Sequence, residues 1–425
     1  MSTPRLLHLA DLETIYDDHE RVGRLAGAIS ARRDERTLVV GSGDTTALGA
    51  LAFVREEGRA LARPFYEEIA PDADTLGNHE FDFGVDAAAA WARTTPGRHL
   101  AANVDGLPDG AAEPSAVLEV AGTRVGFVGV THPDTGEIAG IDLDVSFGDP
   151  VAAVRAEAER LRSRGCDRLV FCSHCGSLDA EIAAETDVDA VLGGHDHDRV
   201  VERVDGTLVA RTRGGQAGEF QVVELDDPPT VAVRTIADEL RHDPVEVAYR
   251  ERREASGLDE RVGTLPRALD RRETAALVAD AYRVGGDADV GLVAPGSVRD
   301  GLPASVTRGD VIGVVPFGSV LHVREVSGRT VAGILACCEE PVDETHGRIV
   351  AAGLERGADG AALVGGEPLD PDGTYRVASM SYLTVADVIP GLGADTVAED
   401  RGPQHEHVLG YVEDGRVGTN VPSDP

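Results

Sequence analysis

The chain has 425 residues and a formal net charge of −35, because 75 acidic side chains outnumber 40 basic ones. This length exceeds what one hydrophobic core normally serves and predicts two or three domains, while a hydrophobic content of 42% excludes a disordered acidic chain. The charge also excludes a nucleic-acid partner, since phosphate backbones are bound by basic surfaces.

The first half of the chain alternates short apolar runs with helical stretches. Segment 149–164 has helical periodicity and an Asp149 positioned as its N-cap. This alternation predicts an α/β domain with functional loops at the carboxyl ends of its strands. The runs predicted as strands are 5–10, 37–40, 99–102, 124–130, 168–172 and 190–192.

Near residues 224–229 the pattern changes to a charged helix at 243–256, which predicts a connector. A second α/β domain follows it. Its predicted helices are 273–282 and 330–339, its predicted strands are 290–294, 311–315, 320–326 and 375–379, and a turn is predicted at 295–300.

All 40 basic side chains are arginine, and the acidic residues are spread along the chain. Such a surface suits salty solvent, where the Debye length shrinks to roughly 3 Å at 1 M salt; codon bias is the alternative explanation. We expect a halophilic host. No apolar stretch approaches the roughly 18 residues of a membrane helix, and residues 1–10 lack a signal-peptide pattern, so we expect a cytoplasmic protein without a membrane partner.

The chain has five cysteines, an odd number, and we expect no structural disulfides. Cys172 and Cys175 form a CxxC motif around His174. This motif could be a redox pair or half of a zinc site. Because a second CxxC is missing, small buried thiols are the better interpretation.

Five polar clusters stand at the ends of apolar runs. If the strands are parallel neighbours, these clusters meet at one rim of the sheet. Carboxylate, imidazole and amide ligands suit Zn²⁺, Mn²⁺, Fe²⁺ or Co²⁺ better than Ca²⁺, and this many ligands predicts two cations that share a carboxylate such as that of Asp44. The pattern indicates a dinuclear hydrolase. The clusters are Asp11 with Glu13, Asp44, Asn78 with His79, His174, and His195 with His197.

Three motifs, Gly43-Asp44, Gly77-Asn78-His79-Glu80 and Gly194-His195-Asp196-His197, resemble those of the calcineurin-like metallophosphoesterases. The longer strings LGNHEFDFG (76–84) and VVPFGS (314–319) resemble the two-domain 5′-nucleotidase family. The resemblance implies an α/β fold: a four-layer αββα catalytic sandwich over 1–235, a helical connector over 236–260, a C-terminal α/β substrate-recognition domain over 261–416 and a loose tail over 417–425.

The resemblance also implies roles for individual residues. Asp11, Asp44 and His197 match the ligands of one metal, and Asp44, Asn78, His174 and His195 match those of the other. His79 matches the catalytic histidine and Asp82 its carboxylate partner. Two cations would polarise the phosphoryl group and generate a metal-bound hydroxide that attacks phosphorus. His79 could stabilise the equatorial oxygens or protonate the leaving alkoxide.

One departure from the family lies at Asp11-Leu12-Glu13, where the family usually has Asp-x-His. Glu13 could still be a ligand, and a carboxylate there would favour Mn²⁺ or Mg²⁺-like ions over Zn²⁺. Asp17 or Asp18 could replace it.

In the second domain the resemblance implies that Arg299 binds substrate and that Phe317 and Tyr382 stack on the base. Ser319 stands where the family commonly has Asn, and 384–390 lacks the glycine-rich loop that holds the ribose. We therefore expect a 5′-nucleotidase that takes a small-molecule nucleotide. The alternatives are a 2′,3′-cyclic-nucleotide phosphodiesterase, a nucleotide-sugar pyrophosphatase or a catalytically decayed nucleotide-binding protein. The remaining histidines, among them His132, are expected at the surface or in packing.

Overall fold

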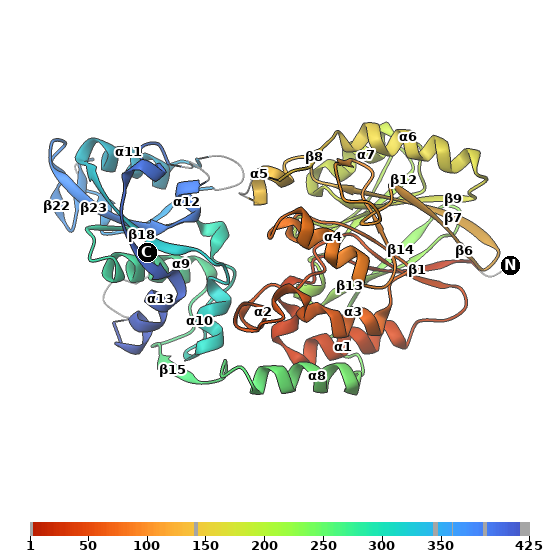
Figure 1. Ribbon diagram of the computed structural model, residues 1–425, viewed down its shortest axis with the longest axis horizontal. Helices are drawn as coiled ribbons and strands as arrows, with labels where there is room; N and C mark the ends of the chain where they lie inside the picture. Colours follow the sequence, from red (N-terminus) through yellow and green to blue (C-terminus); the bar gives the residue numbers. More distant parts are fainter. Residues whose placement is uncertain (1–2, 140–142, 343–346, 359, 386–388, 417–425) are drawn as a thin grey trace. The chain divides into compact units, whose positions relative to one another are not determined.

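The computed structural model describes residues 3–139, 143–342, 347–358, 360–385 and 389–416, so the predicted tail 417–425 lies outside the described residues. The chain forms two compact units, Met1–Arg253 and Glu254–Pro425 (Figure 1). Within the described residues, no helix combines the length and the apolar character that crossing a membrane requires.

Two six-stranded sheets form the centre of the first unit (Figure 1). In each sheet four neighbouring strands run parallel, and antiparallel strands complete it. The first sheet has the order β14 (Thr230–Thr235), β13 (Glu219–Glu224), β1 (Arg5–Leu9), β2 (Thr37–Gly41), β3 (Ala73–Thr75) and β4 (Arg98–Leu100). The second has the order β11 (Val200–Val204), β12 (Thr207–Arg211), β10 (Ala190–Gly193), β9 (Arg168–His174), β7 (Thr123–Thr131) and β6 (Ser115–Val120).

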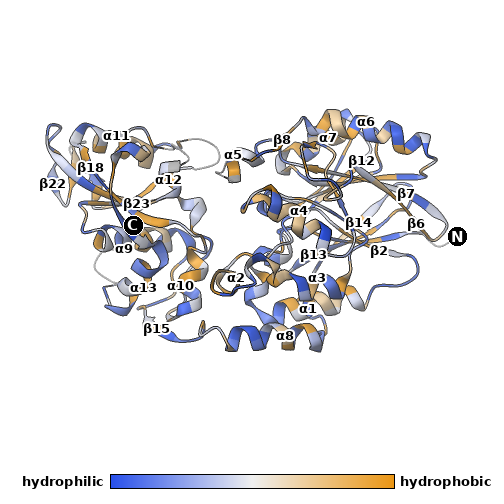
Figure 2. Ribbon diagram, viewed as in Figure 1, coloured by the Kyte–Doolittle hydropathy of each residue, from blue (hydrophilic) through white to orange (hydrophobic). Residues whose placement is uncertain are grey.

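The core of this unit lies between the two sheets, where Leu6 and Val40 of the first pack with Phe127 and Leu192 of the second. Helices cover both outer faces, and their blue outer sides in Figure 2 mark the solvated surface. The predicted four-layer αββα sandwich is therefore confirmed. The helices are α1 (His19–Ser30) and α3 (Arg63–Ile69) beside the first sheet and α6 (Pro150–Ser163) and α7 (Asp179–Glu185) beside the second, while α8 (Asp243–Glu254) packs outside α1. Shorter helices are α2 (Ala50–Val54), α4 (Val85–Thr94) and α5 (Thr135–Ala139).

The predicted connector contains α8, and this helix packs on the first unit. The ring of Tyr249 stacks on Tyr16 with 5.6 Å between centroids, and its hydroxyl donates to the carbonyl oxygen of Leu61 at 2.8 Å. Tyr249 is fully buried there. Most of the charged helix thus belongs to the first compact unit.

The second unit is built on a five-stranded sheet with the order β19 (Val350–Ala352), β16 (Val290–Val293), β23 (Thr374–Met380), β18 (Val320–Ser327) and β24 (Val397–Pro403). Its main helices are α9 (Arg271–Gly285), α11 (Gly328–Glu339) and α13 (Gln404–Glu413). The predicted strand 311–315 is wrong, because α10 (Arg308–Val314) occupies this segment. Thr307 and Asp310 form a capping box that starts the helix, and a short apolar run alone does not distinguish a strand from a buried helix.

Candidate metal centre

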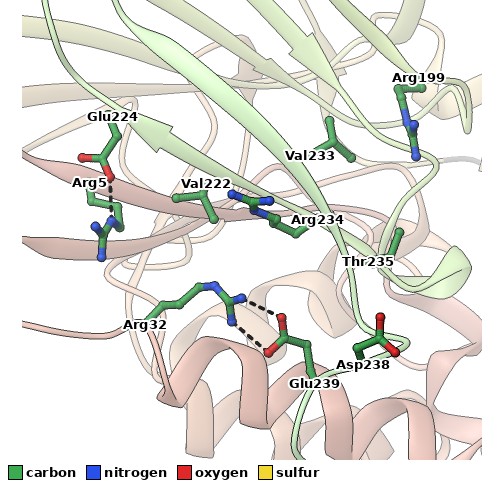
Figure 3. A pocket seen from close by; sticks show the side chains of 10 residues that line it. All are labelled: Arg5, Arg32, Arg199, Val222, Glu224, Val233, Arg234, Thr235, Asp238 and Glu239. Carbon is green, nitrogen blue, oxygen red and sulfur yellow. Dashed lines mark hydrogen bonds and ion pairs between the residues drawn. The ribbon is translucent and has the colours of Figure 1, made fainter.

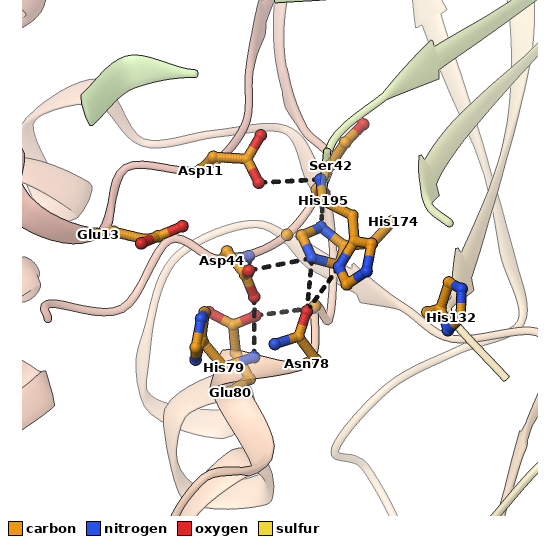
Figure 4. Close-up of polar contacts among 12 residues, drawn as sticks. Asp11, Glu13, Ser42, Asp44, Asn78, His79, Glu80, His132, His174 and His195 are labelled. Atoms are coloured by element: carbon orange, nitrogen blue, oxygen red, sulfur yellow. Dashed lines mark hydrogen bonds and ion pairs between the residues drawn. The ribbon is translucent and has the colours of Figure 1, made fainter. Parts of the chain in front are cut away.

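The predicted ligands lie at the carboxyl ends of parallel strands from both sheets (Figure 4). Asp11 follows β1, Asp44 follows β2 and Asn78 follows β3, while His174 ends β9 and His195 follows β10. The parallel register brings these ends to one rim, as the sequence predicted.

The backbone at this rim takes unusual conformations. Eight described non-glycine residues have a positive φ, and four of these are candidate ligands: Asp11 (53°), Glu13 (33°), Asp44 (53°) and His195 (78°). Such conformations persist where the surrounding structure holds them and cluster at functional sites. Gly77 allows the close approach, because a Cβ there would lie 2.3 Å from Asp44 Oδ1.

One group of ligands surrounds Asp44. His174 Nε2 lies 3.0 Å from Asp44 Oδ2 and 3.1 Å from Asn78 Oδ1, and His195 Nδ1 lies 2.8 Å from the same amide oxygen. His174 Nδ1 donates to the carbonyl oxygen of Ser42 at 2.6 Å, which directs its Nε2 into the cluster.

A second group joins Asp11, Glu13 and His197. His197 Nε2 lies 3.0 Å from Glu13 Oε1 and 3.7 Å from Asp11 Oδ1. The amide nitrogen of Gln216 lies 3.0 Å from His197 Nε2 and 3.3 Å from Glu13 Oε1, and no sequence pattern indicated this neighbour. Glu13 lies within this group, whereas the acidic residues that follow it have other partners. Asp17 accepts from the backbone of Ala50 and Leu51, and Asp18 caps α1.

These residues fit divalent cations. In three sets the potential ligand atoms lie within 4.8 Å of one another, and each set mixes carboxylates with one imidazole. Asp11 Oδ2 is buried and has no hydrogen-bond partner among the described residues, an arrangement that is costly unless a cation is bound. The sets are Asp11, Asp44 and His174; Asp11, Glu13 and His197; and Glu13, Asp44 and His79.

Burial and the neighbouring charges shift the pKa values of three candidate ligands. Burial raises the pKa of Asp11 to about 7. Burial alone would lower the pKa of His174, but the Asp44 and Asp11 carboxylates raise it to about 10. Burial lowers the pKa of His195 to about 3, so this imidazole is neutral and available as a ligand.

Glu80 holds the ligand loops in place, a role that the sequence analysis did not assign. Its two carboxylate oxygens accept hydrogen bonds from four backbone N–H groups at 2.7–3.1 Å. The donors belong to Asp44, Thr45, Thr46 and Gly77. One buried side chain thus joins the loop after β2 to the loop after β3.

His79 and Asp82 form the predicted pair. His79 Nδ1 donates to Asp82 Oδ2 at 2.8 Å, and the backbone N–H of His79 donates to Asp44 Oδ1 at 2.9 Å. Burial opposes the charged imidazole, but the Asp82 and Asp44 carboxylates raise the pKa of His79 to about 9. The imidazole is therefore protonated at neutral pH.

His132, expected at the surface or in packing, packs at the same rim. It directly follows β7, and its ring stacks on His195 with 4.9 Å between centroids. The sequence pattern that indicated the other candidate ligands also holds for His132, because it too follows an apolar run. The thiols of Cys172 and Cys175 are free and buried, and burial raises the pKa of each, which agrees with packing rather than redox chemistry.

The predicted substrate residues of the second unit lie in more open surroundings. The guanidinium of Arg299 lies 5.5 Å from the ring centroid of Phe317, and both residues are half-buried. Tyr382 follows β23, whose end is tied to the start of β18 by a hydrogen bond from Ser381 N to Val320 O at 2.8 Å. Burial and the charge of Arg299 lower the pKa of Arg271, so a second guanidinium lies nearby.

The first unit also has an open groove with a volume of about 600 Å³ (Figure 3). Its arginines are largely neutralised, because Arg5 pairs with Glu224 at 2.8 Å and Arg32 with Glu239 at 2.6 Å. None of the lining residues belongs to the metal cluster. They are Arg5, Arg32, Arg199, Val222, Glu224, Val233, Arg234, Thr235, Asp238 and Glu239.

Comparison with known proteins agrees with this architecture. The family model of the 5′-nucleotidase C-terminal domain matches residues 259–389. The solved structure of a 5′-nucleotidase precursor from Thermus thermophilus superposes with a TM-score of 0.82 at 22% identity, over 99% of this chain and 98% of that one. Protein UshA of Yersinia enterocolitica is 23% identical over 428 residues, 82% of this chain and 76% of that protein.

Residues 259–389 thus match the 5′-nucleotidase C-terminal domain family, and the whole chain has the fold of solved two-domain 5′-nucleotidases. A 5′-nucleotidase of Diplobatis ommata is 33% identical over 172 residues, which cover 38% of this chain and 30% of that protein. For several of the curated relatives, the match spans between 26% and 35% of their length. The candidate metal ligands lie in the first unit, and the matched C-terminal domain forms most of the second.

Proposed function

We propose that this protein is a metal-dependent phosphomonoester hydrolase, a 5′-nucleotidase that releases phosphate from nucleoside monophosphates. The observation that carries the proposal is the convergence of seven carboxylate, amide and imidazole side chains at one rim, with the His79–Asp82 pair beside them. The family relationship supports the same reaction class.

In this proposal Asp11, Glu13 and His197 would hold one divalent cation, Asn78, His174 and His195 would hold another, and Asp44 would contribute to both sites. Mn²⁺, Zn²⁺, Co²⁺ and Fe²⁺ all suit this donor set. When bound, the cations withdraw electrons from the phosphoryl group and activate water as a nucleophile.

The chain's own residues then orient the substrate and supply a proton. Asp82 holds the His79 ring through Nδ1, which leaves the protonated Nε2 to face the phosphate ester. From that position His79 stabilises the equatorial oxygens or protonates the leaving alkoxide. Arg299 and Arg271 attract the anionic nucleotide, and Phe317 and Tyr382 stack on its base.

The test is hydrolysis by purified protein in high salt with Mn²⁺. AMP, 2′,3′-cyclic AMP, UDP-glucose and p-nitrophenyl phosphate are offered separately, and released phosphate is measured after a phosphatase step where the product requires one. We expect AMP to be the preferred nucleotide. Cleavage of p-nitrophenyl phosphate alone would refute the nucleotide assignment, and nucleotide binding without turnover would indicate a decayed binding protein. The halophilic host and the cytoplasmic location stay predictions.

A further inference from the structure

Arg59 lies in a short helical turn, η2 (Gly58–Ala62), and its guanidinium reaches the His79–Asp82 pair. Arg59 Nη2 donates to Asp82 Oδ2, and Nη1 donates to the carbonyl oxygen of His79. Nη1 also lies 3.2 Å from the hydroxyl of Thr46. The side chain is only 14% exposed.

The exposed ring of Phe83 covers one face of this guanidinium. The ring centroid lies 4.9 Å from Arg59 Cζ, while Phe83 itself is 72% exposed. This contact is a cation–π interaction, which adds to the contacts that hold the Arg59 guanidinium.

The bonds of Arg59 complete the restraint of His79. The backbone N–H of His79 is held by Asp44, its ring by Asp82 and its carbonyl oxygen by Arg59. The guanidinium spans the pair, because Nη2 donates to the Asp82 carboxylate and Nη1 donates to the carbonyl oxygen of His79, and its rigid plane fixes the distance between these two acceptors. Asp82 Oδ2 accepts from the guanidinium and from the imidazole, so Arg59 sets the direction in which His79 is held.

We propose that Arg59 is a positioning residue that acts through Asp82 and His79 on phosphoryl transfer. This role rests on the proposed function. It differs from that of Glu80, which holds the backbone of the ligand loops and not the His79 ring.

The test is a double-mutant cycle of Arg59→Gln and His79→Ala, measured as kcat for AMP with saturating Mn²⁺. We expect Arg59→Gln to lower kcat about tenfold to a hundredfold with KM nearly unchanged, and to have almost no further effect in the His79→Ala background. Arg59→Lys, which keeps the charge but loses the fork, should recover part of the rate. Arg55→Gln is the matched control, because Arg55 is a nearby surface arginine paired with Glu57.

Equal losses from Arg59→Gln in both backgrounds, or a loss that follows metal content or the melting temperature, would show a merely structural role and overturn the proposal. Unchanged kcat in Arg59→Gln would also overturn it. If Arg59→Gln does not fold, Arg59→Lys decides by the same cycle. An inactive wild type refutes the proposed function itself, whereas an active wild type with unaltered Arg59 variants refutes only this inference.

Discussion

The two sites differ in how firmly their side chains are held. In the first unit Asp11, Asp44, Asn78 and His174 are at most 3% exposed and have several polar contacts each. In the second unit Arg299, Phe317 and Tyr382 are half-buried. A metal centre requires ligands whose directions are set before the cation arrives, while a stacking surface for a base requires an open face. The difference predicts that substitutions in the first site act on the rate and those in the second on substrate affinity.

The largest expected effect is that of His79→Ala. Loss of the protonated imidazole should lower kcat about 10²-fold to 10⁴-fold for AMP and p-nitrophenyl phosphate alike. Metal content, measured by elemental analysis, should stay at the wild-type value because Asn78 and Asp44 remain. His19→Ala serves as a control on the same unit. If the loss of rate is explained by a loss of bound metal, His79 has no direct role in the reaction.

Cation binding at the first site should strengthen as pH rises. The pKa of Asp11 is about 7 and that of His174 about 10, so both groups hold protons near pH 6.5 that a cation must displace. The Kd for Mn²⁺ should fall about tenfold per pH unit for each displaced proton. Calorimetry in two buffers of different ionisation enthalpy counts the protons, and a Kd independent of pH from 6 to 8 would contradict this.

At the second site Phe317→Ala should raise KM for AMP about tenfold, since stacking on a base contributes about 1–3 kcal/mol. The kcat for AMP should change little. p-Nitrophenyl phosphate is the control substrate, because it has no base to stack. An equal rise in KM for both substrates would place Phe317 outside base recognition and weaken the contrast between the two sites.

The smallest expected effect is that of Glu13→His. Exchange of a carboxylate for an imidazole softens the first cation position, so the ratio of Zn²⁺ to Mn²⁺ affinity should increase about threefold to tenfold. Competition calorimetry on the wild type and the variant measures the ratio. An unchanged ratio would mean that Glu13 does not contribute a ligand atom.

Much of the first site could be predicted, because its candidate ligands directly follow apolar runs that become strands and lie in the motifs Gly77-Asn78-His79-Glu80 and Gly194-His195-Asp196-His197. Gln216 was missed, since its place beside His197 and Glu13 depends on which loops become neighbours in three dimensions, while His132 follows an apolar run and could have been included. The prediction of a strand over α10 was wrong. The short apolar run there fits either a strand or a helix, and the cap formed by the Thr307 side chain favours the helix. The supporting contacts of Glu80 and Arg59 join loops far apart in the chain, and no local pattern reports them.

The left-handed backbone at Asp11, Glu13, Asp44 and His195 bears on how cations bind to this site and leave it. The loops are held in these conformations by the sheets beneath them and by the Glu80 carboxylate that joins the loops after β2 and β3. A chelator would therefore empty the rim and leave the sandwich folded, and reloading would be an exchange of protons for cations rather than a refolding event.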